Sequence, residues 1–360
     1  MTKEILSSIY DYTLDELKER LKPSFRAKQV YNWLYKKYAN SYDDMKNLPK
    51  ELIEDLKTNY PIDILKVVKK EQSRDGSIKY LFKLRDNHTI EAVLLLMKDK
   101  KIDEDGQIVR SEKYTVCISS QVGCKVGCSF CLTARGGFVR NFTVGEYIAQ
   151  IVHIKRDNEI AENKALNIVY MGMGEPLDNF DNFVKAVEIF SELDGLAISR
   201  RRQTVSTSGI ASKIKKLGEK DLQIQLAISL HAVDDELRSE LIPMNKAYNI
   251  ASIIEAVKEF PVDTRKKVMF EYLVIKDKND SLDAAKKLVK LLTGLQAKVN
   301  LIYFNPYPGT TYQRPLETDM MRFKDFLNSK GVICTIRESK GLDISAACGQ
   351  LKEKELNGNS

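Results

Sequence analysis

The spacing of apolar residues changes from a helical to a strand-like pattern near residue 66. In "YTLDELKERL" (12–21) the leucines recur three and four residues apart, and Thr13 with Glu16 forms a capping box, which predicts a helix. The amphipathic segments "FRAKQVYNWLYKKY" and "LPKELIEDLKTNY" predict two more helices. We therefore expect residues 1–66 to form a small helical domain that binds RNA.

A strand-like pattern follows these helices. In "SIKYLFKLRDNHTIEAVLLLM" (77–97), two runs rich in β-branched, aromatic and other apolar residues flank the turn sequence "RDNH", which predicts a hairpin. We expect residues 67–100 to form a β-hairpin adaptor, and "KDKKIDEDGQ" (98–107) to form an exposed, charged turn.

From residue 114 onward, predicted strands and helices alternate. The strands are "YTVCIS", "ALNIVYM", "RQTVSTS", "LQIQLAISL", "KKVMFEYLVI", "KVNLIYF" and the short "GVICTI". The clearest helix is "TVGEYIAQIVHIKR", where Thr143 and Glu146 form another capping box. Such βα units predict a parallel sheet buried on both faces. A closed eight-unit barrel usually needs about 250 residues. We therefore expect an α/β fold with a partial (βα)6 TIM-like barrel over 101–350 and a disordered tail over 351–360.

Composition adds limits to this picture. The chain is 43% hydrophobic and 30% charged, which indicates a globular rather than a disordered protein. No apolar run approaches the roughly 18 residues of a membrane span, and "MTKEILSSIYDYTLDELKER" does not resemble a signal peptide. We therefore expect a cytoplasmic protein with no membrane partner. In that compartment, clustered cysteines more often indicate metal or redox chemistry than structural disulfides.

The net charge is +7, and the segment from Lys18 to Lys37 has seven basic residues against one acid. Four aromatic residues are interleaved with them: Phe25, Tyr31, Trp33 and Tyr35. Cations beside rings suit RNA phosphates and bases. The same pattern also arises in a solvated amphipathic helix whose rings face a core. The basic triplet Arg200–Arg202 could contact RNA phosphates or lie in a solvated loop.

Five polar or glycine-rich motifs follow successive predicted strands. They are the cysteine loop after the first strand, "GMGEP" (172–176), "STSG" (206–209), "SLH" (229–231) and "NPYP" (305–308). In barrels of this class the reactive groups lie at the carboxyl ends of the strands. The five motifs therefore predict one shared site at that rim.

The first of these motifs holds Cys124, Cys128 and Cys131 in the spacing C-x3-C-x2-C. A four-iron cluster normally takes four cysteines, so three of them leave one iron without a protein ligand. A structural zinc ion would need a fourth ligand, which Cys117, His153 or His231 could supply. The spacing alone leaves both kinds of site open.

This spacing, with the aromatic Phe130 before the last cysteine, resembles the radical S-adenosylmethionine superfamily. The resemblance implies a [4Fe-4S] cluster bound by the three cysteines, whose open iron chelates the amino and carboxylate groups of S-adenosylmethionine. One electron then cleaves the S–C5′ bond and releases a 5′-deoxyadenosyl radical. "GMGEP" resembles the superfamily's GGEP element, which implies that Gly174 and Glu175 bind the methionine amino group.

A narrower resemblance covers about residues 25 to 351. "SSQVGCKVGCSFC", "GFVRN", "MGMGEPLDN", "VSTSGI", "SLHA", "NPYPG" and "AACGQL" are similar to motifs of the RNA adenine-C2 methyltransferases that act on ribosomal and transfer RNA. The resemblance implies methylation of C2 of an adenosine in 23S rRNA and in the tRNA anticodon loop, with two S-adenosylmethionine molecules. It also implies a monomer reduced by a protein such as flavodoxin or ferredoxin.

The same resemblance implies roles for residues that spacing could not assign. Cys348, in "AACGQL", would be methylated and would carry the carbon to adenine. Cys117 would resolve the resulting adduct through a transient disulfide, and Glu91 would accept a proton. Contacts with S-adenosylmethionine are implied for Ser206, Ser229, Leu230, His231 and Asn305.

Two alternatives remain open. Relatives that confer antibiotic resistance use the same mechanism at adenine C8, but they typically have alanine where this chain has Pro176. A noncatalytic, zinc-stabilised RNA-binding protein would also account for the cysteines and the basic helix. This chain departs from the C2 family at Lys340, where that family often has arginine.

Overall fold

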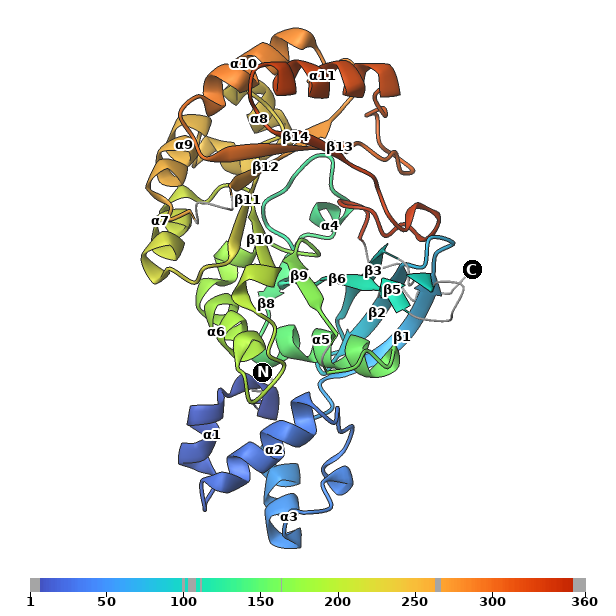
Figure 1. The fold of residues 1–360 in the computed structure, drawn as a ribbon, viewed down its shortest axis with the longest axis vertical. Coiled ribbons are helices and arrows are strands. Elements are labelled where there is room, and N and C mark those ends of the chain that lie inside the picture. The colour runs from blue at the N-terminus through green and yellow to red at the C-terminus, as the bar shows by residue number, and fades with distance from the viewer. Residues whose placement is uncertain are drawn as a thin grey trace.

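The structure is a computed structural model that describes residues 7–98, 101–102, 108–110, 112–162, 164–262 and 267–351. Helices α1 (Leu14–Arg20), α2 (Phe25–Tyr35) and α3 (Lys50–Asn59) form a unit at one end of the molecule (Figure 1). The predicted capping box opens α1, because Thr13 Oγ1 accepts the Glu16 N–H and Glu16 Oε2 accepts the Thr13 N–H. All three predicted helices are therefore confirmed.

The rings of the basic segment divide between core and surface. Tyr31 and Tyr35 are fully buried and face the core. For these two rings the structure agrees with a solvated amphipathic helix whose aromatic side chains face a core. Phe25 is 53% exposed, and the Lys37 ammonium lies 3.9 Å from the centroid of the Trp33 ring. Phe25 is therefore exposed, whereas Trp33 packs partly against the core and the two tyrosines are buried in it.

A ten-stranded sheet forms the body of the molecule, in the order β1-β2-β3-β6-β9-β10-β11-β12-β13-β14. Its first three strands, β1 (Leu65–Gln72), β2 (Ile78–Leu84) and β3 (Thr89–Lys98), are antiparallel, and β3 pairs antiparallel with β6. The parallel part comprises β6 (Lys113–Cys117), β9 (Leu166–Tyr170), β10 (Gln203–Thr207), β11 (Gln225–Ser229), β12 (Val268–Val274), β13 (Ala297–Tyr303) and β14 (Cys334–Arg337). The order ends at β1 and β14, so the sheet is open.

Helices cover the outer face of the curved parallel sheet (Figure 1). They are α5 (Val144–Asp157), α6 (Phe180–Ser191), α7 (Ala211–Lys220), α8 (Asp235–Leu241), α9 (Ile250–Glu259), α10 (Leu282–Leu292) and α11 (Glu317–Ser329). Each directs buried apolar side chains toward the core, and the capping box predicted at Thr143 opens α5. The predicted fold class, a partial α/β barrel with an N-terminal helical part, is confirmed.

Some boundaries differ from those predicted. The segment expected to be a hairpin adaptor contributes three strands to the main sheet, and the first of them already begins at Leu65. Most of the predicted charged turn lies outside the described residues, but Lys101–Ile102 forms β4, which pairs with β5 (Ile108–Arg110). Leu351, assigned to the tail, is buried, and the rest of that tail (352–360) lies outside the described residues. Within the described ranges, no helix is both long and apolar enough to cross a membrane.

Candidate active site

The cysteine loop is closed at its base by a short ribbon of β7 (Gln121–Gly123) and β8 (Phe138–Asn141). The Cys124 N–H donates to Gly137 O at 2.7 Å, and the Ser129 N–H donates to Leu241 O at 3.0 Å. Gly123 has φ +73°, and a Cβ at this position would lie 2.0 Å from Gly137 O. Only glycine allows this close approach of the two strands. The loop is therefore held at both its base and its tip.

Cys124, Cys128 and Cys131 line one cavity of ≈ 160 Å³. Burial raises the pKa of the Cys124 thiol to about 12, and burial followed by the charges of Cys131 and Cys124 raises that of Cys128. Among the described residues, no group of three or more His, Cys, Asp and Glu side chains is placed to hold a metal ion. Three cysteines of one short loop that line a common cavity suit an iron–sulfur cluster, to which each cysteine would contribute one ligand.

The "GMGEP" segment follows β9 and packs against β7. Gly174 has φ +97°, and a Cβ there would lie 2.6 Å from Gln121 Cβ. The Glu175 N–H donates to Gln121 Oε1, while the Glu175 carboxylate accepts the Ser208 N–H at 2.7 Å and the Leu177 N–H at 3.1 Å. Burial raises the pKa of Glu175, and these hydrogen bonds oppose it. Glu175 lines the same cavity as Cys124, Cys128 and Cys131, called the cluster cavity below, and offers carboxylate oxygens suited to an ammonium group.

Three polar side chains line the same cavity from the ends of β10 and β11. Ser206 Oγ and Ser229 Oγ lie 3.4 Å apart. His231 has φ +60°, and its Nδ1 accepts the Leu273 N–H at 3.0 Å. Burial, followed by the Arg238 charge, lowers the pKa of His231 to about 3. The ring is therefore neutral, with its proton on Nε2, because Nδ1 is an acceptor.

Of the other two residues predicted to contact S-adenosylmethionine, Asn305 lines the cavity and Leu230 does not. The Leu230 side chain is fully buried, and Leu230 is not among the residues that line the cavity. Asn305 lines it, but its side chain is already bonded: Oδ1 accepts from Arg314 Nη1 at 2.6 Å, and Nδ2 donates to Ser339 Oγ at 2.8 Å.

The loop that carries Cys348 is held from two sides. At its start, Asp343 Oδ1 accepts from Ser73 Oγ at 2.5 Å and Asp343 Oδ2 accepts the Arg74 N–H, which ties it to the turn between β1 and β2. At its end, the Leu132 N–H donates to Gly349 O at 2.8 Å, beside the cysteine loop. Cys348 consequently lines the cluster cavity.

Cys117, at the end of β6, lines a second cavity of ≈ 630 Å³. Cys348 lines both cavities and is exposed, whereas Cys117 is 8% exposed. All six cysteines are free. The two cysteines proposed to react therefore border a common cavity, which the three cysteines of the loop do not line.

Glu91 lies on β3 and lines neither cavity. The register pairs Val93 with Cys117, so Glu91, two residues from Val93, shares the sheet face of Cys117. Glu91 Oε1 lies 3.4 Å from the Lys79 ammonium, and both side chains are almost completely buried. Glu91 therefore shares a sheet face with Cys117, and the buried Lys79 ammonium lies beside its carboxylate.

Two further residues that line both cavities were not identified from the sequence. Glu271 interrupts the apolar run of β12 and is 3% exposed; Asn300 Nδ2 donates to its Oε2, and burial raises its pKa. Arg337 is the last residue of β14, and its Nη1 lies 3.6 Å from Met171 Sδ. The sequence could have indicated Glu271 by its charge inside an apolar strand, and Arg337 by its charge at the end of a strand.

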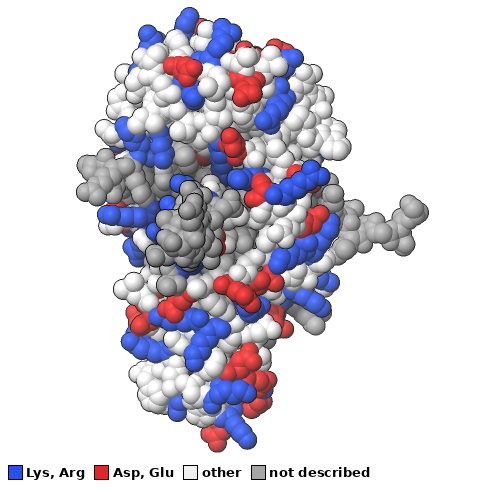
Figure 2. All heavy atoms as spheres, turned by 45° about the vertical axis from the view of Figure 1, so that its right-hand side comes forward, with Lys and Arg blue, Asp and Glu red and all other residues white. Residues whose placement is uncertain are grey.

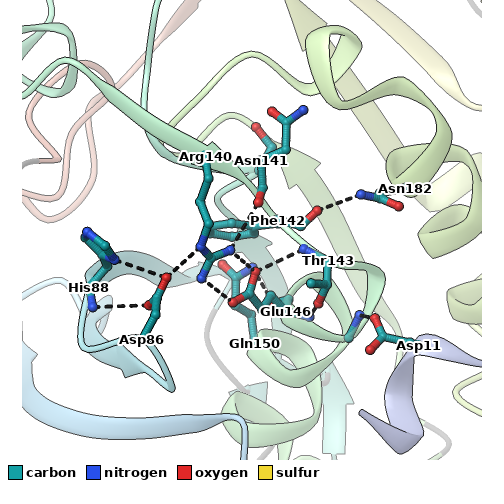
Figure 3. Close-up of polar contacts among 12 residues, drawn as sticks. Asp11, Asp86, His88, Arg140, Asn141, Phe142, Thr143, Glu146, Gln150 and Asn182 are labelled. Atoms are coloured by element: carbon teal, nitrogen blue, oxygen red, sulfur yellow. Dashed lines mark hydrogen bonds and ion pairs between the residues drawn. The ribbon is translucent and has the colours of Figure 1, made fainter. Parts of the chain in front are cut away.

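A charged network lies beside the cysteine loop, and Figure 3 shows it centred on Arg140 of β8. The guanidinium donates from Nη1 and Nη2 to the two carboxylate oxygens of Glu146, each at 2.7 Å, and from Nε to Asp86 at 2.6 Å. His88 Nδ1 lies 3.1 Å from Asp86 Oδ2. The network joins the β2–β3 turn, the end of the cysteine-loop ribbon and the start of α5.

The remaining candidates lie elsewhere. His153 contacts Arg156 and packs edge-on against Phe82, and neither His153 nor Cys117 lines the cluster cavity. Cys334 is buried in β14. Lys and Arg are interspersed with Asp and Glu over the face drawn in Figure 2, without one continuous basic surface.

Two family models match the chain: the radical SAM superfamily over residues 118–289 and the ribosomal RNA large subunit methyltransferase N-terminal domain over residues 9–62. A "Dual-specificity RNA methyltransferase RlmN" from Aliarcobacter butzleri is 91% identical over 360 residues and is covered completely, as is this chain. A protein of the same name from Sulfurimonas denitrificans is 65% identical over 347 residues, which are 96% of this chain and 98% of that protein.

A solved structure agrees with these matches. The radical SAM methyltransferase from Sphaerobacter thermophilus superposes with a TM-score of 0.88 and 43% identity, over 96% of this chain and 99% of that one. These relatives are named as enzymes, which argues against the noncatalytic zinc-stabilised alternative. The cavity bordered by three cysteines, the matching domains and the full-length relatives agree: this chain belongs to the RlmN family of radical S-adenosylmethionine RNA methyltransferases.

Proposed function

We propose that this chain methylates C2 of one adenosine in 23S rRNA and of one adenosine in the anticodon loop of tRNA. The observation that carries the proposal is the placement of Cys348, which lines the cavity of Cys124, Cys128 and Cys131 although it is distant from them in sequence. A purely structural role for Cys348 in its loop would not require its side chain to line the same cavity as the three proposed cluster ligands.

The target carbon explains why a cysteine is needed. Adenine C2 is electron-poor and has no lone pair, so it cannot attack the methyl group of a sulfonium ion. A Cys348 thiolate can do so, and it forms a thioether and S-adenosylhomocysteine with a first S-adenosylmethionine. When bound at the three cysteines, the cluster and a second S-adenosylmethionine supply a 5′-deoxyadenosyl radical, which is the chemistry that activates this methyl group.

The other residues bind the cosubstrate and release the product. Glu175 accepts hydrogen bonds from the methionine ammonium group, and Ser206, Ser229 and neutral His231 offer short polar contacts along the same wall. The Cys117 thiolate attacks the Cys348 sulfur, the bond between that sulfur and the methylene carbon breaks, and a disulfide forms between the two cysteines. The released carbon takes up a proton to become the methyl group, and the single electron left over would return to the cluster that supplied it. Glu91 accepts the proton that leaves C2. The common cavity of Cys117 and Cys348 supports the resolving step.

The substrate and the intermediate are tested in one preparation. The protein is purified and reconstituted without oxygen, incubated with 23S rRNA or tRNA, S-adenosylmethionine and reduced flavodoxin, and the RNA is digested to nucleosides. Mass spectrometry and chromatography against standards should identify 2-methyladenosine. 8-Methyladenosine, or no methylated adenosine, would refute the proposal.

Peptide mass spectrometry tests the intermediate. A Cys348 peptide heavier by one methyl or methylene group is expected after incubation with S-adenosylmethionine. Cys348→Ala should retain iron and sulfide but form no product. Cys334→Ala is the matched control, because this cysteine lines neither cavity, and it should form product normally.

A further inference from the structure

Arg238 is a fully buried cation on α8, behind the wall of the cluster cavity. It does not line that cavity itself, although Ser208 and Ser229, to which it is bonded, both do. Burying a guanidinium is costly because the charge loses its water, and a carboxylate partner normally compensates for the loss. The oxygens that Arg238 binds therefore need to account for its place.

The four hydrogen bonds of Arg238 to the described residues all end on neutral oxygens. Its Nη2 donates to Ser208 O at 2.6 Å and to Ser229 O at 3.0 Å. Its Nε donates to Leu230 O at 3.1 Å, and its Nη1 donates to Asn245 Oδ1 at 2.8 Å. Burial lowers the pKa of Arg238 to about 10, so the group keeps its charge at neutral pH. One charged donor thus holds three backbone carbonyls, and such bonds are stronger than those between neutral groups.

These three carbonyls lie at the carboxyl ends of two neighbouring strands. Ser208 directly follows β10, Ser229 is the last residue of β11, and Leu230 comes next. The paired residues of β10 and β11 end before Ser208 and Ser229, so the guanidinium joins the strands where their ladder has stopped. Gly209 leaves room for it, because a Cβ there, at φ +106°, would lie only 3.3 Å from Arg238 Nη2.

The same strand ends form one wall of the cluster cavity. Ser206 Oγ and Ser229 Oγ lie 3.4 Å apart, and Ser208 lines the cavity with them. The Ser208 backbone is held on two sides, because its N–H donates to Glu175 Oε2 at 2.7 Å and its carbonyl accepts from Arg238. The spacing between Glu175 and the serine side chains therefore depends on a residue that does not border the cavity.

We infer that Arg238 is a positioning residue for S-adenosylmethionine: it holds the ends of β10 and β11, and through Ser208 also Glu175, at the spacing that the bound cosubstrate needs. The planar guanidinium reaches acceptors on both strand ends at once, whereas the three donors of a lysine radiate from one nitrogen. The inference rests on the proposed contacts of Glu175, Ser206 and Ser229 with S-adenosylmethionine. It does not depend on which carbon of adenosine is methylated.

The test measures the dissociation constant of S-adenosylmethionine by equilibrium dialysis, on the anaerobic reconstituted holoenzyme without RNA. Arg238→Met keeps the aliphatic stem but leaves the three carbonyls without their donor. The dissociation constant should therefore rise about tenfold or more, while the iron and sulfide content stays that of the wild type. Arg238→Lys should give an intermediate value, because an ammonium keeps the charge and donates to only part of the same oxygens.

Lys155→Met is the matched control. Lys155 is an almost fully buried cation of α5 that lines neither cavity, so its loss should leave the affinity for S-adenosylmethionine unchanged. Kinetics with RNA separate positioning from a loss of folded protein. Arg238→Met should raise the KM for S-adenosylmethionine and leave the KM for RNA unchanged, and turnover should recover when the cosubstrate is saturating.

Wild-type affinity in Arg238→Met with a full complement of iron would overturn the inference, as would an equal loss of affinity in Lys155→Met. A turnover that stays low at saturating cosubstrate, with an unchanged KM, would show a purely structural role. If Arg238→Met does not fold, Arg238→Lys decides: weaker binding at unchanged iron content supports the inference, and wild-type affinity refutes it. If the wild type forms no 2-methyladenosine, the proposed function fails while the binding measurement still stands.

Discussion

Arg140→Met removes the centre of the network that joins the β2–β3 turn to the ribbon below the cysteine loop (Figure 3). Methionine keeps most of the aliphatic packing but leaves the Glu146 carboxylate without its cation. That carboxylate is only 6% exposed, and it keeps a hydrogen bond from the Thr143 N–H. The substitution therefore tests how much the ion pairs of Arg140 with Asp86 and Glu146 contribute to the free energy of unfolding.

The expected magnitude follows from burial. Removing one partner of a fully buried ion pair costs about 3–5 kcal/mol. Arg140 and Asp86 are 22% and 21% exposed, so water replaces part of the lost interaction. We therefore expect Arg140→Met to lower the free energy of unfolding by about 2–3 kcal/mol. Arg140→Met/Glu146→Gln should lose less, about 1–2 kcal/mol, because glutamine retains the cap without a buried charge.

The effect should also depend on pH. Burial raises the pKa of Asp86, but hydrogen bonds from Arg140 and His88 outweigh it and hold the pKa below its usual range. The resulting stabilisation is present above the unfolded pKa of about 4 and is lost as the pH falls through the lower, folded value. The difference between wild type and Arg140→Met should therefore be largest near neutral pH and shrink below about pH 4.

Urea unfolding of the anaerobic holoenzyme, followed by circular dichroism, measures these differences from the shift in midpoint. Lys216→Met is the matched control, because its ion pair with Asp181 is 3.2 Å long but mostly exposed, and it should cost less than about 1 kcal/mol. A loss below about 1 kcal/mol for Arg140→Met, or a double variant less stable than Arg140→Met, would refute the reasoning.

Three further predictions concern the active site. Cys117→Ser should trap RNA covalently on Cys348, visible as a slow band in a denaturing gel; an unchanged yield of free product would contradict the resolving role. Gly174→Ala should abolish S-adenosylmethionine binding in equilibrium dialysis, because its Cβ would lie 2.6 Å from Gln121 Cβ at φ +97°; wild-type affinity would contradict it. Asp343→Ala frees the C-terminal loop from the β1–β2 turn, so methylation should fall about ten- to a hundredfold while the melting temperature changes little; parallel losses of both would indicate a purely structural role.

Local patterns in the sequence were sufficient for much of the fold. The capping boxes at Thr13 and Thr143 and the alternation of strands with amphipathic helices predicted α1, α5 and the parallel sheet, because these features depend on residues a few positions apart. The same local rule placed Cys124 and Glu175 at strand ends, where the structure brings them to one cavity. The role of the basic helix could not be assigned in this way, since only packing buries Tyr31.

What periodicity and spacing left open depends on contacts between distant segments. Cys348 reaches the cluster cavity because hydrogen bonds at Asp343 and Gly349 hold its loop against two other parts of the chain; spacing could not predict this, and only family resemblance pointed to Cys348. Arg337 became visible only when the barrel brought the ends of β14 and β6 to a common space. Sequence by itself determined which elements form and which residues can react. The tertiary structure decided which of those residues share a cavity and a charge, because burial and Coulomb energy depend on distance in space.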